Sequence, residues 1–360
     1  MINIIMGTKG QYLKMLPVLK ELDRRNIVYN LIHTGQHFLY TKKISEIYGL
    51  KNPDVFLTTK KEDLKNLKDM FIWLVRSLLA AFRLKFKKGD VIVIHGDTES
   101  TLLGVIIAKI KCCKLAHVES GLRSYNYLNP FPEEIIRIIS TLFSEFLFCP
   151  TVKNEVYLRQ YYRHKKIICT YGNTIFDTLA LTVTSNGHKN YRTPSFKYAV
   201  ASIHRKETLY KKKKLVKVVE ILNSVSRELK LLLVLHKNTA YALKKYRLLP
   251  LLKGNKNIII FYDFVDYPEF MKLIKESEFV ITDGGGLQEE TYYLNKPCLL
   301  LRQKTERDYG LSETACLSKF NTEIIKEFIG NYKKFTRRKI DNSFISTQTI
   351  VDYFEKFFAE

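Results

Sequence analysis

The first half of the chain alternates short apolar runs with longer amphipathic stretches. Apolar runs that end at polar or glycine-containing turns are typical of buried parallel strands, and the stretches between them are typical of helices. Residues 12–25 place four leucines on one helical face, and residues 101–110 form a second apolar helix. We predict strands over residues 2–6, 27–33, 91–95, 114–118, 146–149 and 167–170.

The same alternation restarts after residues 171–173, where we predict strands over residues 198–203, 231–235, 258–261, 279–282 and 298–301. The polar segment 182–195, which contains Asn186-Gly187, suits a connection between domains. We therefore predict an α/β protein with two doubly wound, Rossmann-like domains that face a cleft. The expected divisions are residues 1–172, residues 173–345 and a C-terminal helix over 346–360, with the first domain as that helix's candidate packing partner.

Length and charge narrow the class of protein. A chain of 360 residues with 46% hydrophobic residues can bury two full cores. The formal net charge of +23 raises the question of nucleic acid, but Lys and Arg are scattered among Asp and Glu and no nucleic-acid motif is present. We expect no nucleic-acid partner, and an anionic substrate or membrane surface explains the charge better.

The six cysteines lack the spacing of metal ligands, and most of them lie in apolar runs. This pattern predicts buried free thiols in a reducing compartment and no metal site. Because Met1 leads directly into a predicted strand, we expect no signal peptide and a cytoplasmic location.

Residues 70–86 form an apolar, basic stretch that is too short and too charged to span a bilayer. The favoured interpretation is a crossover helix leading to the strand at 91–95, or a dimer face. The alternative is an amphipathic helix that makes a peripheral contact with a membrane surface.

Residues 279–290 read as a strand, the glycines Gly284, Gly285 and Gly286, and an acidic helix. A helix that starts in a glycine turn presents free N–H groups and a positive dipole end, which suit a phosphate or diphosphate. The glycines permit positive φ angles and close approach of the backbone. Glu289 and Glu290, expected on the first helical turn, can accept hydrogen bonds from ribose hydroxyls. The competing interpretation is a turn without a ligand.

Acidic and imidazole groups recur just past predicted strand ends, which is where doubly wound sheets bind ligands. Any one of them could be a helix cap or an ion-pair partner, but their recurrence favours a site for acid–base chemistry. These residues are Asp97, Glu119, Glu133 with Glu134, His204 and His236.

A set of short motifs continues this pattern over nearly the whole chain. Its members are Gly7-Thr8 and the segments 34–37, 95–98, 117–123, 130–134 with Arg137, 172–174, 204–207, 283–290 and 305–307. In this order and spacing the chain resembles the non-hydrolysing UDP-N-acetylglucosamine 2-epimerases, which share the two-domain fold of GT-B glycosyltransferases.

The resemblance implies roles by position. The catalytic groups around the sugar C1–C2 bond would be Asp97, Glu119, Glu133 and His204. Contacts to the UDP-sugar would come from Lys9, Lys14, Arg123, His236, Gly284, Gly285, Gly286, Glu290 and Arg307. The resemblance also implies a homodimer, and a reaction that needs no metal or other cofactor, because basic side chains and helix termini neutralise the leaving diphosphate.

The chain departs from the family at three places. It has Lys9-Gly10-Gln11 where the family usually has Arg-Pro-Glu, and Gly284 where the family usually has serine. Phe38-Leu39 replaces a polar pair in a region that helps bacterial members bind an activating UDP-sugar. Two alternatives to the epimerase therefore stay open: a glycosyltransferase acting on an envelope polysaccharide or lipid, and a non-catalytic nucleotide-sugar binder.

Overall fold

The computed structural model of the chain describes residues 1–58, 67–127, 131–184, 193–262, 266–305, 307, 309–337 and 345–359. They divide into two compact units, Met1–Thr178 with Ser343–Glu360, and Leu179–Asn342. Much of the predicted domain connection, and the motif residues Pro130 and Glu306, lie outside the described residues.

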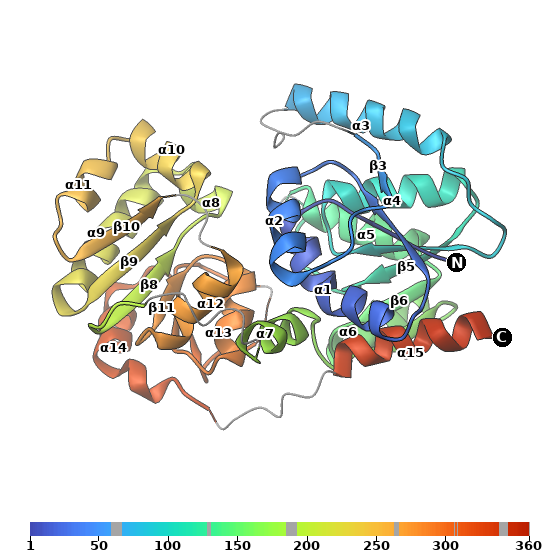
Figure 1. Cartoon of the computed structure of the whole chain (residues 1–360). Coiled ribbons are helices and arrows are strands. Elements are labelled where there is room, and N and C mark those ends of the chain that lie inside the picture. Colours follow the sequence, from blue (N-terminus) through green and yellow to red (C-terminus); the bar gives the residue numbers. More distant parts are fainter. Residues whose placement is uncertain are drawn as a thin grey trace. The chain divides into compact units, whose positions relative to one another are not determined.

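The first unit is an α/β domain whose elements alternate along the chain (Figure 1). They are β1 (Ile2–Met6), α1 (Lys9–Arg24), β2 (Tyr29–His33), α2 (Phe38–Tyr48), β3 (Val55–Phe56), α3 (Leu67–Phe82), β4 (Val91–His95), α4 (Glu99–Ile110), β5 (Lys114–Val118), α5 (Glu133–Phe143), β6 (Phe146–Cys149), α6 (Val152–Tyr162), β7 (Lys166–Cys169), the start of α7 (Ile175–Thr184) and α15 (Ile345–Ala359). The residues of α7 from Leu179 onward belong to the second unit.

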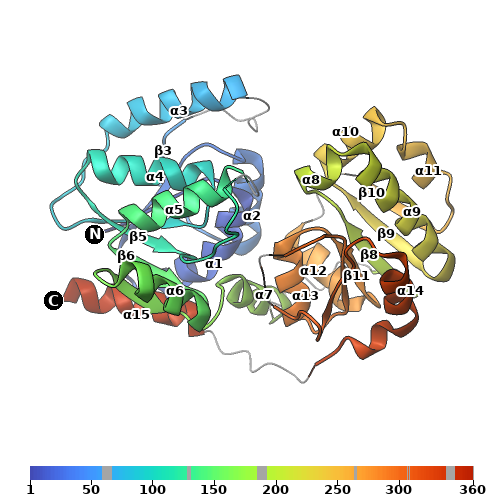
Figure 2. The ribbon, with the colours of Figure 1, turned by 180° about the vertical axis from the view of Figure 1, so that it is seen from behind.

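The seven strands of this unit form one parallel sheet in the order β3-β2-β1-β4-β5-β6-β7. The chain winds outward from β1 in one direction and from β4 in the other, so right-handed crossovers place helices on both faces. Helices α1 and α15 lie together on one face, and α4 and α5 lie together on the other (Figures 1 and 2).

Helix α15 closes the first unit through aromatic and polar contacts. Tyr353 packs edge-on against Phe148 of β6, and Phe354 packs against the same ring at a tilt. At the start of the helix, the backbone N–H and hydroxyl of Thr347 both donate to the Oδ2 atom of Asp177 in α7, at 2.8 and 2.5 Å. Asp177 has no cation beside it in these contacts, and burial raises its pKa from 3.8 to about 6 despite the hydrogen bonds from Thr347.

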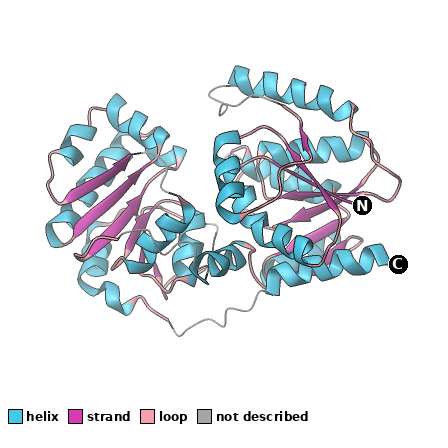
Figure 3. Ribbon diagram, in the orientation of Figure 1, coloured by secondary structure: helices cyan, strands magenta, loops and turns pink. Residues whose placement is uncertain are grey.

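The second unit repeats the α/β pattern with a smaller sheet (Figure 3). Its strands are all parallel, in the order β10-β9-β8-β11-β12-β13. Its elements are β8 (Tyr198–Ser202), α8 (Lys206–Leu209), α9 (Lys212–Glu228), β9 (Lys230–Leu235), α10 (Lys237–Lys245), α11 (Leu249–Lys253), β10 (Ile258–Tyr262), α12 (Tyr267–Glu276), β11 (Val280–Thr282), α13 (Gly285–Tyr293), β12 (Cys298–Leu300), β13 (Ala315–Leu317), α14 (Thr322–Asn331) and the short 3₁₀ turn η2 (Tyr332–Lys334).

The predicted fold class of two Rossmann-like domains is confirmed, and all eleven predicted strands are present within two residues of their expected bounds. The sequence pattern missed β3 and β13, because two and three residues are too few to form a recognisable apolar run. The helix expected over 70–86 ends at Phe82, where the chain turns.

Two further expectations are wrong. Cys112 is exposed rather than buried, because it lies at φ 51° in the turn after α4. Glu133 and Glu134 do not follow a strand but open helix α5. Among the described helices, none combines the length and the apolar character that crossing a membrane requires.

Candidate functional site

The turn after β1 lies beside β4, where the strand order of the first sheet reverses. Thr8 caps α1, and the buried Gln11 joins the turn to the neighbouring strand. The Gln11 Oε1 atom accepts the N–H groups of Gly7 and Thr8 at 3.0 and 3.2 Å, while its Nε2 atom donates to the carbonyl of His95 at 3.0 Å. A carboxylate could accept these bonds but could not donate. The change from the family's glutamate therefore has a structural use.

Lys9 begins α1, and its backbone N–H donates to the Nδ1 atom of His37 at 3.3 Å. The side chain of Lys9 is partly exposed at the same turn. A Cβ atom added at Gly10 would meet no other atom within 4 Å, so glycine is not required there for lack of space.

Glu119 follows β5 in the left-handed region, with φ 68°, and its side chain is only 7% exposed. The Nζ atom of Lys14 lies 2.5 Å from its Oε1 atom, and the Nδ2 atom of Asn173 donates to the same oxygen at 2.6 Å. The Nε2 atom of His95 is 3.5 Å from its Oε2 atom. Two separate segments of the chain thus hold this carboxylate through Lys14 and Asn173, and His95 lies beside it.

The two histidines beside this carboxylate are buried and neutral. Burial lowers the pKa of His95 and of His117 to about 4. The Nε2–H group of His117 donates to the carbonyl of Gly96 at 2.8 Å, which orients the turn after β4. Since His95 is uncharged near neutral pH, Lys14 and not His95 balances the charge of Glu119.

A chain of alternating charges lies between the turn after β4 and helix α5. Arg137 places its Nη2 and Nε atoms 2.6 and 2.8 Å from the Oδ2 atom of Asp97, which is partly exposed. Arg137 also lies 3.4 Å from the buried Glu134, which accepts from Arg123 Nε at 2.6 Å. Arg137 therefore holds the Oδ2 atom of Asp97 in place. Arg123 pairs with Glu134.

Glu134 is ionised in this setting. Burial pushes its pKa upward, but the backbone N–H of Ser124 and the guanidinium of Arg123 outweigh burial and hold the pKa below its usual value. Glu133, the predicted catalytic member of the pair, is half-buried at the first position of α5. The structure thus separates two adjacent glutamates, one buried between arginines and one nearer the surface.

In the second unit, Asp283 joins the turns after β8 and β11, which are neighbours where the order of the second sheet reverses. This fully buried carboxylate accepts the backbone N–H groups of His204 and Arg205 at 2.9 and 3.1 Å. The Nδ1 atom of His204 lies 3.8 Å from its Oδ1 atom. His236 is 3.1 Å from Ser202 Oγ, and its ring centroid is 5.2 Å from that of His204.

The triple glycine lacks one expected feature, a positive φ angle, and has a close contact that was not expected. None of the three residues has a positive φ; Gly284 has φ −91°. A Cβ atom on Gly284 would lie 2.4 Å from His204 Cε1, so a side chain there would displace the imidazole. At Gly286 an added Cβ would meet nothing within 4 Å. His204 therefore approaches the backbone at position 284 so closely that only glycine fits there without moving the imidazole.

Helix α13 begins at Gly285, so Glu289 and Glu290 fall on its second turn instead of the first. Glu289 is buried and pairs with Arg307, and Glu290 is nearly buried. The Nε2 atom of Gln288 donates to the carbonyls of Arg307 and Tyr309 at 3.0 and 2.8 Å. This amide holds the described residues near 307 against α13.

Four residues of the site had no predicted role, although each lies in or beside a motif: Gln11, Asn173, Arg137 and Asp283. Their partners are 40 to 84 residues away along the chain for the contacts described above, so only the fold reveals them. The one signal in the sequence is the Glu134–Arg137 spacing on a predicted helix, which places the two on one face.

Two parallel, doubly wound units, each with polar groups at its strand-order reversal, define a two-domain protein of the nucleotide-binding α/β class. The sequence matches the family described as UDP-N-acetylglucosamine 2-epimerase over residues 20–349. The chain belongs to this family.

Known proteins agree with this assignment. The UDP-N-acetylglucosamine 2-epimerase of Methanocaldococcus jannaschii is 34% identical over 326 residues, which cover 85% of this chain and 84% of that protein. The crystal structure of the M. jannaschii enzyme in complex with UDP-GlcNAc and UDP aligns with a TM-score of 0.85 at 30% identity, covering 99% of both chains. The UDP-2,3-diacetamido-2,3-dideoxy-D-glucuronate 2-epimerase of Pseudomonas aeruginosa is 30% identical, covering 84% of this chain and 83% of that protein.

Proposed function

We propose that the protein is a non-hydrolysing 2-epimerase that interconverts UDP-N-acetylglucosamine and UDP-N-acetylmannosamine, or a close UDP-2-acetamido sugar, for cell-surface polysaccharide synthesis. The observation that carries the proposal is the buried Glu119 carboxylate, balanced by Lys14 and held by Asn173, in a chain of this family. We propose a class of sugars rather than one sugar, because one relative is a 2-epimerase of UDP-2,3-diacetamido-2,3-dideoxy-D-glucuronate.

The first unit supplies the groups that would act on the sugar. Breaking the C1–O bond sends its electron pair to the departing UDP and leaves positive charge on C1. An ionised Glu119 stabilises that charge in a low-dielectric setting. Asp97 would take the C2 proton. Arg137 would position this carboxylate by binding its Oδ2 atom. Loss of the proton forms the C1=C2 bond of a 2-acetamidoglucal.

Return of UDP completes the reaction. A proton is delivered to C2 on the opposite face while the UDP oxygen bonds to C1, so atoms and charge balance over the cycle. Glu133, half-buried at the start of α5, is the proposed partner for this second proton transfer. His204 is the proposed proton donor to the diphosphate; its imidazole lies against Gly284.

The second unit supplies the proposed nucleotide site. Backbone N–H groups of Gly285 and Gly286 at the start of α13 would receive the diphosphate, as helix N-termini do. Glu290 on the same helix would accept from ribose hydroxyls, with His236 and Arg307 adding hydrogen bonds or charge. In the first unit Lys9 and Lys14 would add positive charge near the UDP-sugar. Arg123 would act indirectly, through its ion pair with Glu134.

A glycosyltransferase of the same fold is the competing function. It would not need a carboxylate set for removing a C2 proton, and the named relatives are 2-epimerases. One experiment separates the outcomes: incubate the purified protein with UDP-N-acetylglucosamine alone and identify products by NMR. UDP-N-acetylmannosamine supports the proposal, free N-acetylmannosamine with UDP indicates a hydrolysing enzyme, and an unchanged substrate contradicts activity on this sugar.

We also propose a homodimer working in the cytoplasm. All six cysteines are free, as suits a reducing compartment. Helix α3 exposes an apolar stripe of Phe71, Val75, Leu79 and Phe82 that a second copy would cover. Peripheral contact of residues 70–86 with an anionic membrane is the other proposed use. Light scattering and flotation with anionic vesicles distinguish the two.

A further inference from the structure

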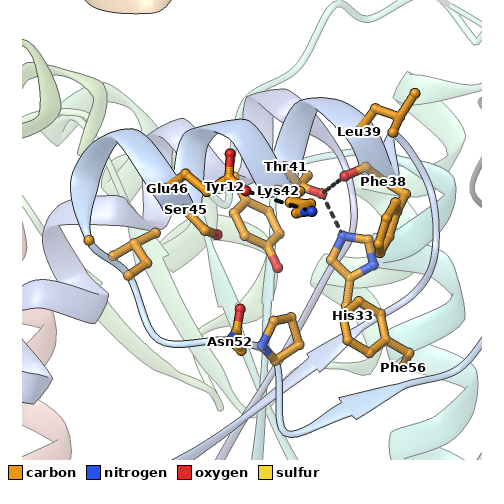
Figure 4. Close-up of a pocket in the computed structure, with 13 residues that line it drawn as sticks. Tyr12, His33, Phe38, Leu39, Thr41, Lys42, Ser45, Glu46, Asn52 and Phe56 are labelled. Atoms are coloured by element: carbon orange, nitrogen blue, oxygen red, sulfur yellow. Dashed lines mark hydrogen bonds and ion pairs between the residues drawn. The ribbon is translucent and has the colours of Figure 1, made fainter.

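A cavity of about 610 Å³ lies in the first unit beneath α2, between that helix, α1 and the segment that leads to β3 (Figure 4). None of the residues assigned to the UDP-sugar lines it. Its size falls within the range of sites that hold small organic molecules.

The phenol of Tyr12 forms part of the wall. Tyr12 is 1% exposed, and its hydroxyl makes no hydrogen bond among the described residues. In Figure 4 the hydroxyl points into the space between His33, Asn52 and helix α2. Buried hydroxyls almost always have a partner. Burial also raises the Tyr12 pKa, so the group stays a neutral phenol that can donate and accept.

Aromatic rings make up much of the remaining wall. The His33 ring lies 5.5 Å from the Tyr12 ring and 5.3 Å from the Phe56 ring, and Phe38 is 5.7 Å from Phe56, all between centroids. His33 is neutral, because burial and the nearby His37 lower its pKa to about 4. Leu50 adds aliphatic surface. Such a lining favours a flat, apolar ring.

The charge around the cavity argues for a neutral ligand. Among the described lining residues only Lys42 and Glu46 carry charge, and they lie 3.7 Å apart on successive turns of α2 with mostly exposed side chains. The cavity therefore offers neither an unpaired cation for a phosphate nor an unpaired carboxylate for an amine.

We propose that this cavity is a binding site for an uncharged aromatic molecule that carries a hydroxyl or amide group, with that group hydrogen-bonded to Tyr12. The proposal does not rest on the epimerase activity. It also differs from binding of a second UDP-sugar, whose diphosphate would find no counter-charge here.

The cavity is connected to a natural reporter. The Nδ1 atom of His33 accepts the backbone N–H of Gly35 at 2.8 Å, and the indole N–H of Trp73 donates to the carbonyl of Thr34 at 2.6 Å. Trp73 is the single tryptophan of the chain. A ligand that packs on His33 should therefore change the fluorescence of Trp73.

Three probes of similar shape test the proposal on the full chain, with binding followed by Trp73 fluorescence and calorimetry. Benzyl alcohol carries the ring and a hydroxyl, toluene lacks the hydroxyl, and benzoate adds a charge. We expect saturable binding of benzyl alcohol, binding of toluene weaker by about five- to tenfold, and no binding of benzoate at the same concentrations. Absence of benzyl alcohol binding, or equal binding of benzoate, overturns the proposal.

Three variants test whether the probes bind in this cavity and contact Tyr12. Tyr12→Phe should weaken benzyl alcohol binding to the level of toluene and leave toluene binding unchanged. Because the hydroxyl has no hydrogen-bond partner among the described residues, the fold should be preserved. Tyr246→Phe, which loses a surface hydrogen bond to Tyr210 in the second unit, is the matched control and should change neither. Ser45→Phe, which fills the cavity, should abolish both. A preference for benzyl alcohol that survives Tyr12→Phe contradicts the assignment.

Discussion

The candidate functional groups fall into two halves, one in each unit, and the two halves are held in place by opposite means. In the first unit the candidate groups are held by ion pairs: the buried Glu119 pairs with Lys14, and the partly exposed Asp97 pairs with Arg137, which also pairs with the buried Glu134. In the second unit the proposed ligand contacts are an exposed imidazole, His204, and backbone groups of a glycine turn anchored by one buried acid, Asp283. A preorganised charge array suits a transition state with developing charge, and a backbone cradle suits a diphosphate that leaves and returns. We therefore propose chemistry for the groups of the first half and nucleotide binding for those of the second.

The largest expected effect comes from removing the charge at the centre of the first half. Glu119→Gln keeps the shape but removes the negative charge that faces C1, so kcat should fall by about 10²–10³. UDP affinity, measured by calorimetry, should stay within about twofold, because no nucleotide contact is assigned to Glu119. Glu155→Gln, which loses only a surface pair with Arg159, is the control. A variant that loses UDP binding along with turnover contradicts the division between the halves.

Removing the partner cation tests whether the ion pair acts as a unit. Lys14→Met leaves Glu119 buried without its cation, and we expect a loss of about 3 kcal/mol in the free energy of unfolding. The double variant Lys14→Met/Glu119→Gln removes both charges and should regain most of that loss. Urea unfolding of all four forms gives the coupling energy. Additive effects would mean that the two groups are not coupled.

In the second half, two glycines two residues apart should respond differently. Gly284→Ser restores the residue usual in the family and forces the His204 ring to move, so kcat should fall by about tenfold. Gly286→Ser has room for its side chain at a proposed diphosphate contact, so KM should rise more than kcat falls. Steady-state kinetics of the pair separate the cases. An unchanged kcat in Gly284→Ser would contradict the proposed role of His204 in the reaction.

Asp177 contrasts with the ion pairs of the first unit, because it is a buried carboxylate with no cation beside it among the described residues. Its folded pKa is raised to about 6 by burial. The folded state therefore holds the proton more tightly than the unfolded state, and stability falls as pH rises from about 4 to about 6 and is level above. Asp177→Asn, whose oxygen can still accept both bonds from Thr347, should be more stable than the parent by about 1–3 kcal/mol above pH 6. Below pH 4 the difference should vanish.

Unfolding curves at several pH values check this prediction. A difference between Asp177→Asn and the parent that does not change with pH would show that the carboxyl does not titrate in this window. The same series on Glu134, whose pKa is lowered by its arginine partner, should show stability lost as pH falls below the usual glutamate range.

The sequence predicted the sheets because their strands are continuous apolar runs, which burial on both faces demands. It also predicted where the polar groups collect, since parallel strands end at one edge. It could not predict that Lys14, Glu119 and Asn173 meet, because 105 and 54 residues separate the partners. It singled out Gly284 for a ligand, but it could not predict the close approach of His204, because that contact cannot be read from neighbouring residues.

The central claim is that the C2 proton of the sugar is removed and replaced during turnover. Incubation with UDP-N-acetylglucosamine in deuterium oxide, followed by proton NMR and mass spectrometry, tests it most directly. We predict that UDP-N-acetylmannosamine appears with deuterium at C2, and that Glu119→Gln slows labelling and epimerisation equally. Epimerised product that keeps its original C2 proton would contradict the account.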